Sequence, residues 1–177
     1  YYRPLVNVSG DYYSVLPIDS SKTLLMLGDV SGKGLPAALI MGLVMNTVKI
    51  MEDKEDLVSM IRGVDKAIKG MHLQDKYTVL FLGIVDTEKM KITYINASMS
   101  DPIILSRSPD GYRIKSLSST ASLVGIIDMD DVKVAEQRLF RGDMILLATD
   151  GVSEVMDDNG VELGDTDLYR ETLQSSA

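Results

Sequence analysis

The order of apolar and polar residues predicts two strands and then two helices in the first half of the chain. Residues 6–18 alternate like a strand, and residues 23–30 form a nearly continuous apolar run that is typical of a buried strand. A helix over residues 35–51 begins at Pro36, where the missing N–H of proline costs nothing. This helix is apolar on nearly every side, so we expect it to be buried or covered by a partner. A second helix over residues 56–71 has apolar residues at helical spacing: Leu57, Met60, Ile61, Val64 and Ile68.

The second half of the chain predicts short strands joined by tight turns. The strand-like segments are residues 77–85, 91–95, 102–106, 112–116, 132–139 and 144–148. Their short spacing favours hairpins, and therefore mostly antiparallel sheet. Strands, two helices and then many strands indicate an α+β fold rather than alternating βαβ units. No repeat or linker interrupts this order, so we expect residues 1–177 to form a single domain.

Composition excludes several classes of partner. The chain has 177 residues, 45% of them apolar, which is enough for a substantial core. Its net charge of −8 argues against a nucleic-acid partner and against an anionic membrane surface. The longest apolar stretch, residues 35–51, contains Asn46 and Lys49 and is short for a membrane span, so we expect no membrane insertion of this domain. Because the chain begins at Tyr1 without a signal peptide, we interpret it as a cytoplasmic domain from a longer protein.

Three aspartates beside apolar segments are the main candidates for chemistry. Asp11 lies near Gly10, a predicted bulge or kink; Asp29 ends the second strand, and Asp150 follows the last one. Carboxylates at the ends of buried strands are costly without a positive partner, and we find no matching set of cations nearby in the sequence. A divalent metal is therefore a natural partner. With no cysteine and with His72 as the one histidine, such a metal has to be held by oxygen, as magnesium, manganese and calcium are.

Each aspartate also has a structural interpretation. Asp29 is placed to cap the following helix, although Ser31 lies closer to the helix start. Asp150 precedes Gly151, as turn aspartates commonly do, and Asp11 suits a bulge or turn. These alternatives stay open for each residue alone. Their common position beside apolar strand segments favours convergence on one site.

The glycine-rich loop after Asp29 invites two nucleotide-binding interpretations. A Walker A loop fails on spacing and residue type, because Lys33 stands where that motif needs glycine. The loop from Gly32 to Ala37 does match the looser G-x-G-x-x-A dinucleotide fingerprint. That fingerprint requires a second parallel strand, and here a second helix follows instead. A sharp turn into an ordinary helix is the simpler interpretation.

Three ordered sequence blocks resemble one family. The blocks are Gly10-Asp11-Tyr12-Tyr13, Gly28-Asp29-Val30-Ser31-Gly32-Lys33-Gly34-Leu35-Pro36-Ala37-Ala38 and Gly142-Asp143-Met144-Ile145-Leu146-Leu147-Ala148-Thr149-Asp150-Gly151-Val152-Ser153-Glu154. Together they resemble the SpoIIE/RsbU branch of the PPM (type 2C) metal-dependent serine/threonine phosphatases. The resemblance extends over about residues 2–173. It implies a PPM-like sandwich of two antiparallel β-sheets flanked by helices.

The resemblance also implies a reaction and a set of roles. Two manganese or magnesium ions are expected, with Asp29 bridging both, the Val30 carbonyl assisting, Asp11 serving one ion and Asp150 the other. A water made acidic by the ions then attacks phosphorus, so no protein nucleophile is needed. The expected substrate is phosphoserine or phosphothreonine on a small STAS-type anti-sigma-factor antagonist. An upstream sensor domain in the parent chain and a homodimer are the further partners that we expect.

Three departures from the family pattern define a second hypothesis. Ser14 stands where the family often has a second acid, and Asn96-Ala97-Ser98-Met99 replaces Asn-Ala-Gly-His. The late Asp-Asp-x-Thr block does not occur before Ala177, so the C-terminal end of the fold is expected to be truncated; Asp165 and Asp167 come too early to replace that block. The alternative is therefore a catalytically impaired signalling or interaction module that keeps the fold.

Overall fold

A computed structural model describes residues 10–73, 75–109, 111–156 and 159–162. Contacts within the chain divide it into two compact units. The first unit comprises Tyr1–Met99 and Ser119–Arg138, and the second comprises Ser100–Ser118 and Leu139–Ala177. The prediction of a single domain over the whole chain stays a prediction, and each unit is described by itself.

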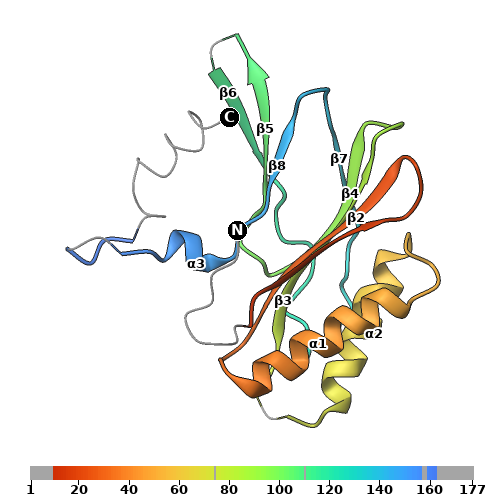
Figure 1. The fold of residues 1–177 in the computed structure, drawn as a ribbon, viewed down its shortest axis with the longest axis vertical. Coiled ribbons are helices and arrows are strands. Elements are labelled where there is room, and N and C mark those ends of the chain that lie inside the picture. The colour runs from red at the N-terminus through yellow and green to blue at the C-terminus, as the bar shows by residue number, and fades with distance from the viewer. Residues whose placement is uncertain (1–9, 74, 110, 157–158, 163–177) are drawn as a thin grey trace. The chain divides into compact units, whose positions relative to one another are not determined.

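The first unit is an antiparallel sheet with two helices packed on one face (Figure 1). Its strand order is β1-β2-β3-β4-β7. The elements are β1 (Tyr12–Pro17), β2 (Lys22–Val30), α1 (Leu35–Ile50), α2 (Leu57–Gly70), β3 (Thr78–Asp86), β4 (Lys91–Ala97) and β7 (Ala135–Arg138). Every second residue of β2 is buried, from Leu24 to Val30, and these side chains join the core formed with the helices. The intervening residues, including Asp29, therefore lie on the other face.

The second unit is a smaller antiparallel sheet of strand order β6-β5-β8. It contains β5 (Ile103–Ser108), β6 (Gly111–Ser116), β8 (Met144–Leu146) and the short helix α3 (Asp150–Ser153). The strand β8 is only three residues long, and Met144 and Leu146 are 42% and 36% exposed. The sequence therefore correctly placed a strand here, but its prediction of a five-residue buried strand was wrong.

The predicted fold class is confirmed: the chain has two antiparallel sheets with helices, and the predicted helices match α1 and α2 closely. Among the residues described, the first strand begins at Tyr12; predicted strand residues 6–9 lie outside the described residues. The helix α1 is not buried on every side within the first unit, and the alternative expectation, that a partner covers it, stays a prediction. The inner face of α1 is buried, whereas Leu35, Leu39 and Ile50 are 71%, 54% and 68% exposed. No helix in the described part of the chain has the length and apolar character needed to cross a membrane.

Candidate metal centre

The first candidate site lies where β1 and β2 meet, and two glycines make it possible. The strand register pairs Tyr12 with Gly28, and a Cβ on Gly28 would lie 2.3 Å from the Tyr12 hydroxyl oxygen. On the other strand, a Cβ on Gly10 would lie 2.8 Å from the Asp29 carboxylate oxygen Oδ1. Each glycine therefore leaves space for a side chain of the opposite strand. This exchange accounts for the glycine on each strand.

Oxygen atoms from two successive residues face the space beside Gly10. The hypothetical Cβ of Gly10 would lie 2.5 Å from the Val30 carbonyl oxygen as well as close to the Asp29 carboxylate. The Val30 N–H donates to the Gly10 carbonyl at 3.2 Å, which continues the strand register and places Asp11 opposite Asp29. A carboxylate oxygen and a carbonyl oxygen, which lie together beside Gly10, are the ligand types of magnesium and manganese. The Asp29 carboxylate and the Val30 carbonyl are therefore donor types that suit a divalent ion, and the participation of Asp11 stays a prediction.

The main chain of Asp29 is held from the core side by Thr78. The Thr78 hydroxyl donates to the Asp29 carbonyl oxygen, with the two atoms 2.7 Å apart. The Tyr12 hydroxyl lies 2.8 Å from the same threonine oxygen. Because a threonine hydroxyl has one proton, Tyr12 is the donor whenever Thr78 donates to Asp29. Tyr12 and Thr78 therefore connect β1, β2 and β3 directly behind the candidate ligands.

The pKa of Tyr12 responds to this environment. Burial raises the pKa of the Tyr12 hydroxyl well above its ordinary range, the hydrogen bond with Thr78 opposes that rise, and the negative charge of Asp29 adds to it. Tyr12 is 3% exposed and therefore remains a neutral hydrogen-bond donor over the physiological range. Sequence analysis did not single out Tyr12 or Thr78, because their roles depend on cross-strand contacts.

The capping interpretation of Asp29 was wrong. The helix α1 has Gly34 as its N-cap, at a φ of 78°, and no side chain makes a capping hydrogen bond there. Ser31 has another role: its N–H donates to the Tyr77 carbonyl at 2.9 Å, and its hydroxyl accepts from the Tyr77 N–H at 3.1 Å. The loop after Asp29 is therefore fastened to the start of β3.

A lysine lies at this strand end, which sequence analysis did not anticipate. The Lys76 ammonium donates to the Ser31 carbonyl oxygen at 3.2 Å. The two residues are 45 positions apart in the chain, so a search of neighbouring sequence could not find the pair. Tertiary structure thus brings one ammonium beside the loop that follows Asp29.

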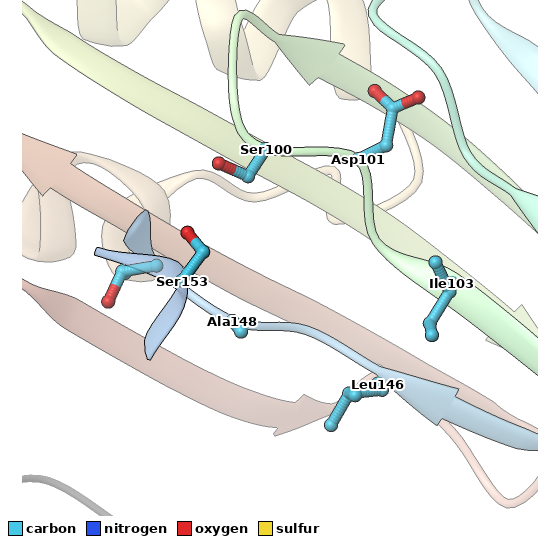
Figure 2. A pocket seen from close by; sticks show the side chains of 7 residues that line it. Ser100, Asp101, Ile103, Leu146, Ala148 and Ser153 are labelled. Carbon is cyan, nitrogen blue, oxygen red and sulfur yellow. The ribbon is translucent and has the colours of Figure 1, made fainter. Parts of the chain in front are cut away.

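Asp150 lies in the second unit and has a different setting. It is exposed and is the first residue of α3, which follows Thr149 without a side-chain capping bond. A pocket of about 110 Å³ lies against this segment. Figure 2 shows serine side chains toward one end of the pocket and Ile103 and Leu146 toward the other. The pocket residues are Ser100, Asp101, Ile103, Leu146, Ala148, Thr149 and Ser153.

The structure brings together part of the predicted ligand set. Asp11, Asp29 and the Val30 carbonyl belong to one strand end in the first unit, whereas Asp150 belongs to the second unit. Within the described ranges, no group of three or more His, Cys, Asp or Glu side chains is placed to hold a metal ion. Asp165 and Asp167 lie outside the described residues. The ligand set of Asp11, Asp29, the Val30 carbonyl and Asp150 therefore stays a prediction.

Comparison with known proteins identifies the class. Residues 19–177 match the family model for Stage II sporulation protein E (SpoIIE). The chain belongs to the SpoIIE family of PP2C-type phosphatase domains. This result confirms the resemblance found in the sequence.

Particular relatives show how much of each protein is shared. The chain is 27% identical over 158 residues to the phosphoserine phosphatase RsbU of Bacillus subtilis, covering 89% of this chain and 46% of RsbU. It is 25% identical over 148 residues to stage II sporulation protein E of the same organism, covering 83% of this chain and 17% of that protein. The chain thus spans less than half the length of these curated relatives. The solved SiaA-PP2C domain of Pseudomonas aeruginosa has the same fold, with a TM-score of 0.79, 20% identity, and coverage of 96% of this chain and 67% of that one.

Proposed function

We propose that this domain hydrolyses phosphoserine or phosphothreonine on a protein substrate, using two manganese or magnesium ions. The observation that carries the proposal is the convergence of the Asp29 carboxylate and the Val30 carbonyl on the space beside Gly10, with Asp11 opposite Asp29. Carboxylate and carbonyl oxygens are the ligand types that magnesium and manganese prefer. Membership of the SpoIIE family supports the same activity.

The chain's own residues divide the work between them. Asp29 and the Val30 carbonyl would hold an ion at the strand end together with Asp11, and the family resemblance would assign Asp150, in α3 of the second unit, to the second ion. When bound, the divalent ions supply an acidic water and positive charge against the phosphoryl oxygens. Thr78 and Tyr12 keep the Asp29 main chain in place through the hydrogen bonds already described. The chain contains no cysteine, and His72 is exposed, which agrees with a mechanism without a protein nucleophile.

Family membership supports a proposal for the biological setting. We propose a STAS-type anti-sigma-factor antagonist as the phosphoprotein, in bacterial signalling and in the cytoplasm. A sensor domain elsewhere in the parent chain is the expected regulator. The exposed apolar side of α1, with Leu35 and Leu39, is where we expect a neighbouring domain or a second copy to contact this unit.

Replacement of Asp29 by Asn tests the proposal. Hydrolysis of a phosphoseryl protein by the parent protein should require manganese, and Asp29→Asn should lower turnover by at least about 1,000-fold, equivalent to about 4 kcal/mol. Asp19→Asn is the matched control, because that exposed carboxylate accepts N–H groups of its own turn, from Ser21 and Lys22. The control should keep normal turnover. Turnover that persists in a chelator, or in Asp29→Asn, would refute the proposal.

A catalytically impaired signalling module is the second candidate. Ser14 in place of a frequent second acid, and the absence of a three-ligand group among the described residues, favour it. Titration calorimetry of the parent protein with manganese separates the two candidates. Two ions bound together with turnover support the enzyme, whereas a folded protein that binds its partner without binding manganese supports the module.

A further inference from the structure

Lys76 is held beside the loop that follows the candidate metal ligands. Its ammonium donates to the Ser31 carbonyl oxygen at 3.2 Å, and the Ser31 and Tyr77 main chains are joined by a hydrogen bond of 2.9 Å. A second bond of 3.1 Å, from the Tyr77 N–H to the Ser31 hydroxyl, fixes the backbone directly after Lys76. The lysine is half-buried. Its position is therefore set by the fold, unlike that of an ordinary surface lysine.

The loop gives the ammonium room because it has no side chain at the point of closest approach. Gly32 has a φ of 86°, and a Cβ on this residue would lie 2.8 Å from the Lys76 Nζ atom. Glycine is therefore favoured at position 32 both by its backbone conformation and by the lysine beside it. The ammonium therefore lies against backbone atoms of this loop. Because Gly32 has no side chain, position 32 does not shield the ammonium from a ligand.

The charge of Lys76 has no carboxylate partner among the described residues. The ion pairs there use Lys22, Lys69 and Lys91. An ammonium has three donors, and the Ser31 carbonyl accepts from one of them. In a chain of net charge −8, a fixed cation without a carboxylate partner is a favourable place for an anion.

The anion is identified by what lies at the same strand end. Val30 and Ser31 are consecutive, and their carbonyl oxygens face different partners: the first faces the space beside Gly10, and the second faces Lys76. A phosphoryl group bound to a metal ion at the Val30 carbonyl would have further oxygen atoms free. One of them could accept a hydrogen bond from an ammonium, with N···O at about 2.7–2.9 Å. We propose that Lys76 binds the phosphoryl group of the substrate across the end of β2. This inference rests on the proposed function and adds a substrate-binding residue to it.

A purely structural role predicts different behaviour. If Lys76 served only to hold the Ser31 carbonyl, its loss would loosen the loop beside Asp29 and Val30 and would weaken manganese binding. If it binds phosphoryl oxygens, removing its positive charge leaves manganese affinity unchanged or slightly higher, because like charges repel. The sign of the change in manganese affinity therefore distinguishes the two roles.

Substitution of Lys76 in the parent protein provides the test. In saturating magnesium, Lys76→Gln should weaken orthophosphate binding, followed by phosphorus NMR, by about 10-fold, the loss of one charge-assisted contact. The KM for a phosphoseryl peptide should rise by a similar factor, with a smaller change in kcat. Lys76→Arg should restore most of the affinity. Lys33→Gln, which removes an exposed lysine from the same loop, is the matched control and should change neither quantity.

The outcomes separate this inference from the proposed function. Unchanged phosphate affinity in Lys76→Gln, an equal loss in Lys33→Gln, or weaker manganese binding in Lys76→Gln would each overturn the role of Lys76, even if the enzyme is active. A parent protein that binds no orthophosphate in magnesium also overturns it. Wild-type protein that binds phosphate through Lys76 but hydrolyses no phosphopeptide instead overturns the proposed activity and leaves the binding role supported.

Discussion

Asp29 and Asp150 carry similar sequence signals but lie in different surroundings. Asp29 is the last residue but one of a nine-residue strand with neighbours on both sides, and its carbonyl oxygen accepts a hydrogen bond from Thr78. Asp150 begins a four-residue helix after a three-residue strand, and it is exposed. The first carboxylate is positioned by the sheet, whereas the second is carried by a short exposed helix.

This difference indicates that the Asp29 strand end is formed before a ligand binds, whereas the Asp150 helix is not held as firmly. At the strand end near Asp29, Tyr12 packs over Gly28 and Asp29 lies beside Gly10. These close contacts leave the side chains little conformational freedom. A short exposed helix has few buried contacts and opens at low free-energy cost. We therefore expect the Asp29 side to be rigid and the Asp150 side to adjust, and the following predictions test that contrast.

The largest effect is expected from adding one methyl group at Gly28. In Gly28→Ala the new Cβ has to displace the Tyr12 side chain or the Val79 carbonyl, because the Tyr12 hydroxyl oxygen and the Val79 carbonyl oxygen lie 2.3 and 2.8 Å from its ideal position. Overpacking of this kind should lower the free energy of unfolding by about 3 kcal/mol. Chemical denaturation measures the change.

Gly151→Ala is the matched control for this prediction. A Cβ at Gly151 would meet the Thr149 hydroxyl oxygen at 3.9 Å, which is an ordinary contact, so the free energy of unfolding should change by less than about 0.5 kcal/mol. Equal effects of the two substitutions would contradict the contrast between the two sides.

The second-largest effect is a fall in the free energy of unfolding at high pH. Tyrosine has an ordinary pKa of 10.0, and burial raises the pKa of Tyr12 in the folded protein. Above pH 10, the unfolded chain loses a proton that the folded chain keeps, so stability falls as pH rises. By pH 11 the accumulated loss from this one group is about 1.4 kcal/mol.

Comparison with Tyr12→Phe isolates the contribution of Tyr12, because the other seven of the eight tyrosines remain in both proteins. The free energy of unfolding of the wild type should fall more steeply between pH 9 and 11 than that of the variant. Parallel curves for the two proteins would show that Tyr12 is not buried as described.

The smallest effect concerns the Tyr12 hydroxyl at neutral pH. Tyr12→Phe removes the hydrogen bond to Thr78 and should cost about 1 kcal/mol of stability. Ser118→Ala is the counterpart in the second unit, because its hydroxyl donates to the Asp101 carboxylate on an exposed surface. That substitution should change stability by less than about 0.5 kcal/mol. If Ser118→Ala lowered the free energy of unfolding more than Tyr12→Phe, the Asp29 side would not be the more rigid of the two.

Much of the fold could be predicted because its signals are local. The apolar run of β2, the helical spacing in α2 and the proline near the start of α1 each act over a few residues. Predictions were weaker where burial depends on distant neighbours. Residues 144–148 are as apolar as a buried strand, yet β8 has three residues and is half exposed. The outer face of α1 is apolar and exposed for the same reason.

The sequence alone determined the family, the α+β order of elements and the aspartates that are candidates for metal binding, because these are properties of residue type and spacing. Tertiary structure decided which atoms meet. The placement of Tyr12 over Gly28, the convergence of Asp29 and Val30 beside Gly10, and the approach of Lys76 to Ser31 each join residues that lie far apart in the chain. The physical reason is that strand pairing sets such contacts, and the pairing of β1, β2 and β3 is a property of the folded sheet as a whole.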